Sequence, residues 1–417
     1  MSAPQASGAP PFPWRQVALP AFGPSLIGSI GTGAVAPILA LAARDLGASV
    51  ALAAFFVALP LLAELLLALP VGALIDRLGE RVALTLGALL AAGAGLLGWY
   101  AASLWSLAAA VVLLGPSGVV LVVARQSWLG QVAPPSQRAR AMSTLGGVVR
   151  IGWFLGPLGA APLIAIVGPR GSFLVLGAAG LLAAALTWWS MDLDHLELDG
   201  LESLPRSHPG SGRRSRLRGG ALRHTWAAHR HTFLTVGLGV LVIGLARTAR
   251  TAVVPLWAQH IGMSASDVAL LFSLTFGLEM LLFFPAGWIM DRFGRVWVAV
   301  PVAVGLGGAL LALPLATTPA WVVVATLVMG LSNGMGSGVV MTLGADLAPE
   351  NGRGAFLGIW RWLNLIGTNG AALLVSAVTA FAGLASAAVL VGALAVAGGG
   401  WLARWVPRHT SAGESRS

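Results

Sequence analysis

Seven charged side chains stand inside long apolar stretches of this 417-residue chain, where an unpaired charge is costly. Two are glutamates and five are arginines: Glu64, Glu279, Arg125, Arg150, Arg247, Arg250 and Arg361. A carboxylate in such a place can form an ion pair or take up a proton, whereas a guanidinium stays cationic and can hold an anion. The surplus of arginines over glutamates favours a negatively charged ligand or ion.

Other kinds of site chemistry are poorly represented. The chain has no cysteine, so it can form neither disulfides nor thiolate metal sites. His208, His224, His229 and His231 are scattered and lack carboxylate partners, so no metal site is predicted. There is no Gly-x-Ser-x-Gly, no His-Glu-x-x-His and no phosphate-binding loop. We therefore predict no catalytic residues, no cofactor and no enzyme activity, and we exclude an ATP-driven pump.

The composition places the chain in a membrane. Hydrophobic residues make up 57% of it and charged residues only 10%, whereas soluble domains carry roughly a quarter charged residues. All 25 basic residues are arginine, which together with heavy alanine, glycine and proline usage indicates a GC-rich bacterial genome. We expect a multi-pass protein of the bacterial inner membrane, whose partners are the lipid bilayer and a small molecule, with no nucleic acid involved.

The chain also contains an internal repeat. The stretch ELLLALPVGALIDRLG from Glu64 to Gly79 returns as EMLLFFPAGWIMDRFG from Glu279 to Gly294, displaced by 215 positions with eight of sixteen residues identical. Gly47 and Gly262, Pro134 and Pro349, and Gly152 and Gly367 follow the same offset. Two similar hydrophobic halves in tandem indicate a transporter built from parallel repeats, with its substrate site between them.

Twelve apolar runs are long enough to cross a bilayer, since a spanning helix needs about 20 apolar residues. They cover residues 17–41, 51–75, 82–104, 107–132, 142–167, 173–189, 233–257, 268–290, 296–315, 321–347, 355–381 and 385–406. The predicted fold is an all-α membrane protein with twelve transmembrane helices in two pseudo-symmetric six-helix bundles. We expect a monomer.

Arginine placement predicts the orientation, because short cytoplasmic loops are rich in basic residues. With both termini inside, 18 arginines are cytoplasmic and only Arg44 and Arg170 are outside. The predicted organisation is a cytoplasmic tail over 1–16, bundles over 17–190 and 232–406, a cytoplasmic linker over 191–231 and a cytoplasmic tail over 407–417. The linker is either a solvated tether or, from Leu217 to His231, an interfacial helix on anionic lipid.

The segment GALIDRLGER, Gly72 to Arg81, resembles the loop between helices 2 and 3 of the major facilitator superfamily, and GWIMDRFGR, Gly287 to Arg295, resembles its second copy. In that family the loop latches the two halves on the cytoplasmic side. The matching residues are Gly72, Asp76, Arg77, Gly79, Arg81, Gly287, Asp291, Arg292, Gly294 and Arg295. The resemblance implies that Arg295 pairs with Asp346 and Asp291, and Gly72 and Gly287 permit close helix packing. In the first copy Glu80 replaces the arginine and Gln131 the acid, so we expect that latch to be weaker or differently wired.

A second resemblance lies in the fifth helix, where Gly152, Gly156 and Pro157 are similar to the antiporter motif of proton-coupled exporters in this family. Proline bends a helix and glycine permits tight packing, so a merely close-packed helix is the alternative. The sequence departs from the family at Ala160 and Ala161, which replace the final glycines. Leu114 occupies the position of an arginine common in such exporters, and Arg125 follows three turns later.

The family fold sets helix 2 against helix 11 and helix 5 against helix 8. Glu64 lies about 16 Å, Arg150 about 15 Å and Arg361 about 12 Å from the cytoplasmic ends of their helices, and Glu279 repeats Glu64. We hypothesise that Glu64 pairs with Arg361 and Glu279 with Arg150, as proton-coupled gates of one access state. Two static structural pairs are the alternative.

Candidate substrate-cavity residues are Arg125, Arg247, Arg250, Asn333 and Asn364. Arg247 and Arg250 lie one turn apart on helix 7, which lines the central cavity in this family. Alternatively these arginines bond backbone carbonyls or extend to the interface, and the amides join helices.

The predicted function is secondary active transport by alternating access, with proton-coupled efflux of small organic molecules or drugs, as in bacterial drug and metabolite exporters. The alternatives are an organic-anion or metabolite transporter, working as an importer or symporter, and a non-transporting membrane sensor with the same fold. A proton gradient is the expected driving force.

Overall fold

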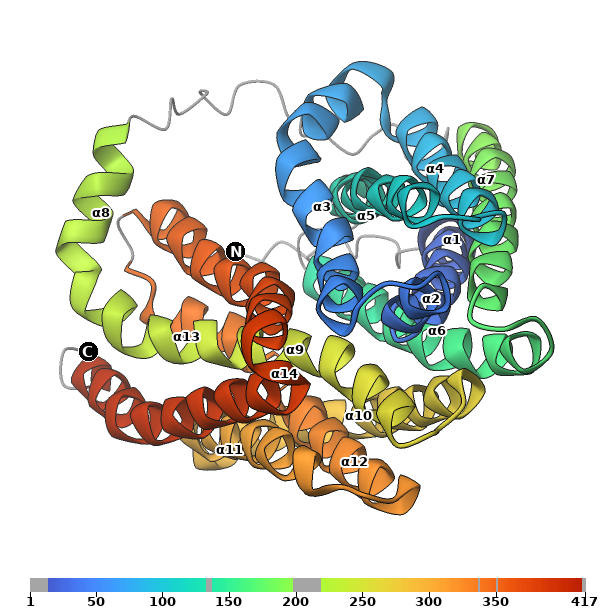
Figure 1. The fold of residues 1–417 in the computed structure, drawn as a ribbon. Coiled ribbons are helices and arrows are strands. Elements are labelled where there is room, and N and C mark those ends of the chain that lie inside the picture. Colours follow the sequence, from blue (N-terminus) through green and yellow to red (C-terminus); the bar gives the residue numbers. More distant parts are fainter. Residues whose placement is uncertain (1–13, 133–136, 198–218, 337, 350–351, 415–417) are drawn as a thin grey trace, which may run out of the picture.

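The computed structural model describes residues 14–132, 137–197, 219–336, 338–349 and 352–414 and shows two helical bundles (Figure 1). The first, the N-half, comprises α1 (Trp14–Val35), α2 (Leu39–Asp45), α3 (Val50–Leu78), α4 (Glu80–Trp99), α5 (Leu104–Val132), α6 (Arg138–Val167) and α7 (Gly171–Glu197). The second, the C-half, comprises α8 (Gly219–Thr232), α9 (Leu238–His260), α10 (Ala265–Phe293), α11 (Val296–Ala312), α12 (Pro319–Met335), α13 (Val339–Leu347) and α14 (Arg353–Glu414).

The predicted all-helical membrane fold is confirmed. The described residues contain 11 helical stretches long and apolar enough to span a bilayer. The last of these, 353–407, is broken at Gly383, whose φ is +85°, and therefore holds two spans, which gives the twelve predicted. Helices are expected in a bilayer because the hydrocarbon core cannot hydrogen-bond to the backbone, whereas a helix pairs its own N–H and C=O groups.

The repeat seen in the sequence is also present in the backbone. Three pairs of glycines, each 215 positions apart, adopt the same left-handed conformation: Gly47 and Gly262 (φ 87° and 86°), Gly79 and Gly294 (77° and 95°), and Gly168 and Gly383 (80° and 85°). Each pair joins equivalent helices, where only glycine avoids a steric penalty. The corresponding turns of the two halves therefore have the same geometry.

Helix packing within each half repeats in the same way. A Cβ atom on Gly152 of α6 would lie 2.8 Å from the Leu26 carbonyl oxygen of α1, and one on Gly367 of α14 would collide with the Leu241 carbonyl of α9. Both pairs of positions differ by 215. The absence of a side chain at these two glycines lets equivalent helices touch through their backbones.

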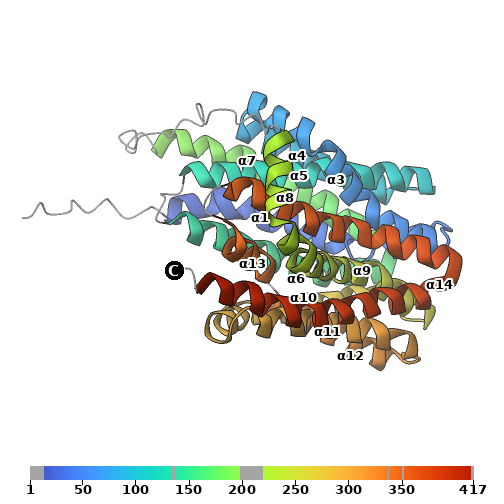
Figure 2. The same ribbon diagram turned by 90° about the vertical axis from the view of Figure 1, so that its left-hand side faces the viewer.

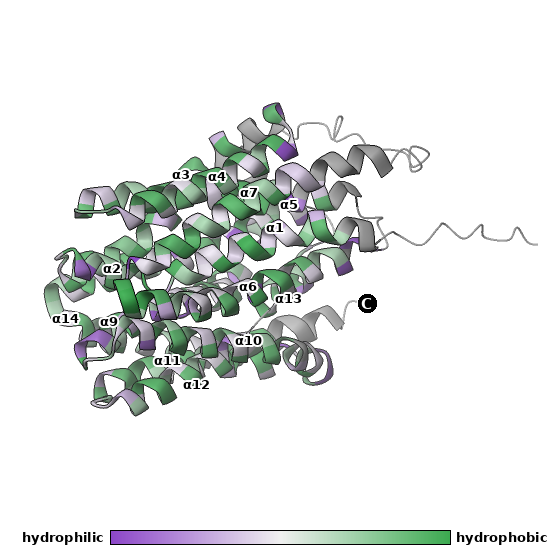
Figure 3. Cartoon of the chain, turned by 90° about the vertical axis from the view of Figure 1, so that its right-hand side faces the viewer, coloured by the Kyte–Doolittle hydropathy of each residue, from purple (hydrophilic) through white to green (hydrophobic). Residues whose placement is uncertain are grey.

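The start of α1 and the end of α14 lie at the same end of the molecule (Figure 2), which we call the terminal face. The opposite end, which holds Gly47 and Gly262, is the distal face. The halves spread apart toward the terminal face (Figure 3). Four hydrogen bonds between the halves lie in the distal part: Arg44 to Gln259 (3.4 Å), Ser266 to the Ala161 carbonyl (3.0 Å), Ser273 to the Phe154 carbonyl (2.8 Å) and Ser376 to the Ala51 carbonyl (2.8 Å).

The region between the halves differs in part from the predicted tether. Residues 198–218 lie outside the described part, but α7 continues to Glu197 and α8 is a transverse helix outside the bundle (Figure 2). Trp226 of α8 stacks on Phe233 with ring centroids 5.3 Å apart, which gives this polar helix an apolar anchor. Likewise, α14 extends to Glu414 through most of the predicted C-terminal tail. Whether α8 lies on lipid stays a prediction.

Candidate functional site

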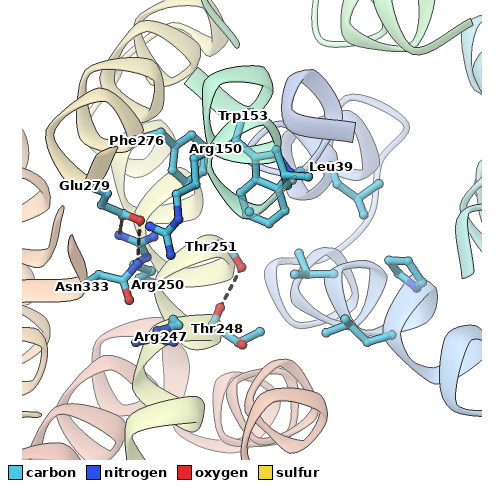
Figure 4. Close-up of a pocket in the computed structure, with 16 residues that line it drawn as sticks. Leu39, Arg150, Trp153, Arg247, Thr248, Arg250, Thr251, Phe276, Glu279 and Asn333 are labelled. Atoms are coloured by element: carbon cyan, nitrogen blue, oxygen red, sulfur yellow. Dashed lines mark hydrogen bonds and ion pairs between the residues drawn. The ribbon is translucent and has the colours of Figure 1, made fainter. Parts of the chain in front are cut away.

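A cavity of about 520 Å³ lies between the two halves (Figure 4). Its N-half wall is formed by Ala36, Leu39, Val57, Pro60, Leu61, Gly146, Val149, Arg150 and Trp153. Its C-half wall is formed by Arg247, Thr248, Arg250, Thr251, Phe276, Glu279 and Asn333. One wall is therefore mostly apolar with a single arginine, and the other carries most of the polar groups.

The C-half wall contains a buried ion pair. Arg250 Nη1 on α9 lies 2.6 Å from Glu279 Oε1 on α10, and the two side chains are only 4% and 9% exposed. Asn333 Nδ2 on α12 donates to the other carboxylate oxygen at 2.6 Å. Because a carboxylate only accepts, this bond fixes the Asn333 amide, whose buried Oδ1 has no hydrogen-bond partner among the described residues.

The predicted pair of Glu279 with Arg150 does not form in this structure, because Arg250 occupies the carboxylate. Arg150 reaches the cavity from α6 (Figure 4). Its guanidinium lies beside the Phe283 ring, 4.9 Å from the ring centroid. Both α6 of the N-half and α9 of the C-half pack against α10, and it is the arginine of α9 that reaches Glu279. Sequence spacing gave the correct depth for Arg150 but could not rank the two arginines.

Arg247 of α9 contacts the break between α12 and α13. α12 ends at Met335 and α13 begins at Val339, after Gly338 with φ +91°. Arg247 Nη2 donates to the Gly336 carbonyl oxygen at 3.3 Å, and the same oxygen accepts from the Val339 N–H group at 3.3 Å, so Arg247 adds a second hydrogen bond to the backbone at the break. The guanidinium also lines the cavity, so the two interpretations made from sequence for Arg247 describe the same position.

The cavity is consequently cationic. Three arginines, Arg150, Arg247 and Arg250, face a single carboxylate, that of Glu279. Because Arg250 is neutralised by its ion pair, the charges of Arg150 and Arg247 are not balanced by any acidic residue lining the cavity.

Glu64 and Arg361 lie outside the cavity lining. Both side chains are exposed, and no ion pair between them forms in the described part of the structure, so the predicted bridge is open in this state. Asn364 is another candidate that the cavity excludes: its side-chain oxygen packs 3.2 Å from where a Cβ on Gly244 of α9 would be. Asn364 packs against α9 at this glycine.

Arg125 also lies away from the cavity. It is 1% exposed, and its Nη1 donates to the carbonyl oxygen of Pro20 on α1. That carbonyl would normally accept from residue 24, but residue 24 is proline and has no N–H group. The arginine of α5 therefore supplies the hydrogen bond that α1 cannot make for itself.

Replacing Arg125 with methionine, which keeps the length and apolar stem, is expected to lower stability by about 1–3 kcal/mol, the cost of an unsatisfied buried group. Thermal unfolding of the detergent-solubilised protein, followed by tryptophan fluorescence, measures this. Arg404→Met removes an arginine from the exposed surface of α14 and is the control. Equal stability of both variants would contradict the role of Arg125.

Most of the residues that line the cavity were not predicted from sequence, among them Trp153, Thr248, Thr251 and Phe276. Their positions could have been found by helical spacing. Trp153 lies three residues after Arg150, and Thr248 and Thr251 each follow a predicted cavity arginine. The rings of Trp153 and Phe276 meet edge to face at 5.5 Å across the halves, beside the charged cluster.

The second copy of the latch has the arrangement that the resemblance implied. Arg295 Nε donates to Asp346 Oδ2 at 2.8 Å, and its Nη1 donates to Asp291 Oδ1 at 3.2 Å. The hydrogen bond to Asp346 is the main reason that the pKa of Arg295 is raised above its ordinary value, so the guanidinium stays charged. These contacts tie α10 to α13 within the C-half. Arg292 lies over Trp288, 5.2 Å from the ring centroid.

The first copy is wired differently. Arg81 donates to the Trp188 carbonyl of α7 at 2.8 Å and stacks over the ring of the same residue at 4.2 Å. The side chains of Asp76 and Gln131 lie outside the described residues, as does the packing of Gly72, and Arg77 is exposed. The close packing predicted at Gly287 is wrong for this structure, since a Cβ there would meet nothing within 4 Å.

The glycines of the fifth-helix motif pack inside the N-half. A Cβ on Gly156 would collide with the Ile30 carbonyl of α1, whereas one on Gly159 would meet nothing within 4 Å. Pro157 follows Gly156 in the middle of α6. The motif therefore holds α6 against α1, which agrees with the close-packing alternative.

We expect Gly156→Ala to destabilise the protein by about 1–3 kcal/mol through overpacking. Gly159→Ala is the matched control and should be neutral or slightly stabilising, because alanine favours a helix by up to about 1 kcal/mol over glycine. Thermal unfolding of both variants tests this. If Gly156→Ala is as stable as Gly159→Ala, α1 and α6 do not need the glycine.

Comparison with known proteins agrees with the fold. The model of the Major Facilitator Superfamily matches residues 25–235 and 236–417, one match for each half. A crystal structure of a D-xylose–proton symporter is similar, with a TM-score of 0.70 and 15% identity over 96% of this chain and 99% of that one. No curated protein sequence matches the chain.

Two further solved structures show the same architecture. The inward-open xylose transporter XylE from E. coli has a TM-score of 0.68 and 16% identity over 96% of this chain and 99% of its own. A POT family transporter in complex with a thioalcohol-conjugated peptide has a TM-score of 0.72 and 13% identity, covering 95% and 97%. With two six-helix halves around a central cavity and a family match over almost the whole chain, this protein belongs to the Major Facilitator Superfamily and is a secondary transporter rather than an enzyme.

Proposed function

We propose that this transporter moves a small organic anion with an apolar portion across the membrane by alternating access. The observation that carries the proposal is the charge of the cavity, where Arg150 and Arg247 have no balancing carboxylate. Guanidinium groups present forked N–H donors that match carboxylate, sulfonate or phosphate oxygens. Of the two substrate classes expected from sequence, drugs in general and organic anions, this charge favours the anion.

The opposite wall supports the apolar portion of the substrate. Leu39 of the N-half lies across the cavity from the polar groups of α9 and α10 (Figure 4), and Val57 and Leu61 line the same cavity. A ligand whose anionic group lies near Arg150 and Arg247 therefore places the rest of its body against aliphatic side chains. Ligand sites with mostly apolar walls and a few placed polar groups are the usual arrangement for small molecules.

The direction we propose is efflux driven by proton antiport, with the terminal face in the cytoplasm, where the positive-inside rule puts the arginine-rich loops. Export of an anion from a negatively charged interior moves with the membrane potential, at about 2.3 kcal/mol per charge for each 100 mV. Entry of a proton is favoured by the same potential and by the pH gradient. Both steps therefore run downhill, and uptake of the anion would need symport of additional cations.

Proteoliposomes provide the test. The purified protein is reconstituted, and exchange of labelled organic anions is compared with that of neutral and cationic molecules of the same size and apolar surface. We expect saturable exchange for anions alone, and faster loss of anion when protons can enter on the opposite side. Equal transport of the neutral compounds would overturn the substrate class, and binding without exchange would favour a sensor.

A further inference from the structure

We propose that Glu64 is the carboxylate that couples transport to protons, and that it does so by closing onto Arg361 across the seam between α3 and α14. Its repeat partner Glu279 is instead a fixed part of the substrate cavity. This inference rests on the proposed function and adds which of the two glutamates carries the proton. Glu64 and Glu279 occupy equivalent positions in the sequence repeat, but their structural environments are not equivalent.

The two glutamates differ in their surroundings. Glu279 is held by Arg250 and Asn333. The positions that correspond to these two partners in the N-half, 215 residues earlier, are Val35 and Gly118. Glu64 therefore cannot form the same cage, and it has no hydrogen bond or ion pair with any residue that the structure describes. One carboxylate is neutralised and buried, and the other is exposed.

Glu64 lies on the path between the cavity and the terminal face. Val57, Pro60 and Leu61 line the cavity from α3, and they precede Glu64 by seven, four and three residues. Residues at this spacing share one face of a helix. Glu64 is thus one turn beyond the cavity on the same face of α3, toward the terminal face, where the halves spread apart (Figure 3). Water from either side can reach it as the cavity changes access.

Arg361 stands at the same level on the opposite side of the seam. In the distal part, Ser376 of α14 donates to the Ala51 carbonyl of α3 at 2.8 Å. From this link, Glu64 is 13 residues along α3 and Arg361 is 15 residues back along α14, which places them about 20 and 23 Å toward the terminal face. In the distal part, α3 and α14 are therefore joined by a hydrogen bond. Toward the terminal face, the oppositely charged Glu64 and Arg361 lie at the same level without forming an ion pair.

Arg361 is the charged group that faces Glu64 across the seam, and the two attract each other electrostatically because α14 packs against α3. The other charged residues described on the helices that pack against α3 are Arg44 and Asp45 on α2, Glu80 and Arg81 on α4, Arg125 on α5, Arg247 and Arg250 on α9, and Arg353 and Arg404 on α14.

The protonation state of Glu64 then decides whether the terminal side can close. Closing buries the seam, and an ionised Glu64 can pair with Arg361 as it does so. A protonated Glu64 would leave the arginine buried without a partner, which typically costs a few kcal/mol. The terminal side therefore closes with Glu64 ionised and opens when a proton binds its carboxylate oxygen. The proton enters from the distal side, crosses as the halves switch and leaves to water at the terminal face.

Three variants in proteoliposomes test the coupling: Glu64→Gln, the double variant Glu64→Gln with Arg361→Gln, and Glu279→Gln at the matched repeat position. We expect Glu64→Gln to slow anion exchange at equal pH, because Arg361 is stranded when the seam closes. The double variant should restore exchange at equal pH while an imposed pH gradient no longer changes its rate. Glu279→Gln should transport poorly, and whatever transport remains should still respond to the gradient.

The proposal is overturned if the double variant does not restore exchange, or if a pH gradient still accelerates its exchange. It is also overturned if Glu279→Gln, and not Glu64→Gln with Arg361→Gln, loses the response to the gradient. If the wild-type protein exchanges no anion at equal pH, the proposed function fails, and the seam is tested without substrate. Because the chain has no cysteine, Glu64→Cys with Arg361→Cys can be cross-linked by a short bifunctional reagent. We expect cross-linking there and none for Leu65→Cys with Arg361→Cys; no cross-link at Glu64 would show that the pair never closes.

Discussion

Replacing Glu279 with leucine is expected to lower the free energy of unfolding by about 3–5 kcal/mol, because it leaves Arg250 buried without its partner. Arg250 is 3% exposed, so its guanidinium would have little contact with water in place of the lost carboxylate. Asn333 loses its acceptor in the same step. The measurement is thermal or denaturant unfolding of the detergent-solubilised protein, followed by tryptophan fluorescence.

The double variant Glu279→Leu with Arg250→Met separates the stranded charge from the loss of packing. An apolar pair of similar volume is often as stable as a buried ion pair, so the double variant should recover most of the stability. It should not recover transport, because the wall of the cavity has lost its polar groups. A double variant no more stable than Glu279→Leu would show that the ion pair is not the unit that matters.

The second large effect is expected on substrate affinity. Arg150→Gln and Arg247→Gln each remove one of the two unbalanced charges, and a hydrogen bond to a charged group is worth about 1.5–3 kcal/mol. Anion affinity should therefore fall by about 10- to 150-fold in each variant, since 1.4 kcal/mol is a factor of ten. Competition binding or the half-saturation concentration for exchange in proteoliposomes gives the number.

Two controls define the result. Arg404→Gln removes the same charge from the exposed surface of α14 and should leave anion affinity unchanged. Arg150→Lys keeps the charge but loses the planar fork, so its affinity should lie between those of the wild type and Arg150→Gln. If Arg150→Gln and Arg247→Gln bind the anion as the wild type does, the cavity charge does not select the substrate.

Most of the fold could be predicted from the sequence, because its signals are local and repeated. Apolar length gives the spans, and the glycines at 47, 79 and 168 recur at 262, 294 and 383 with the same backbone conformation. Element ends were less well predicted. α7 extends to Glu197 beyond its apolar run, because a helix continues where polar residues reach water and no proline or glycine interrupts it, and α14 continues past Pro407 to Glu414.

The candidate site could be predicted only in part. Depth along a helix follows from counting residues, so Glu279 and Arg150 were correctly expected at one level, and both line the cavity. Which arginine meets Glu279 depends on where each side chain reaches in the folded protein, since α6 of the N-half packs against α10 more extensively than α9 does. Arg125 could have been assigned from the sequence by noticing Pro24, but its distant acceptor on α1 required the fold.

The hydrogen bond from Arg125 to the Pro20 carbonyl has a mechanical consequence for the transport cycle. In hydrocarbon a bare carbonyl finds no water, so α1 cannot tilt away from α5 without exposing one. The glycines of α6 fasten the other side of α1 through direct backbone contact. We therefore expect α1, α5 and α6 to move as one rigid body during transport. The relative movement that opens and closes the pathway then takes place between the halves, where α3 packs against α14 and α6 packs against α10.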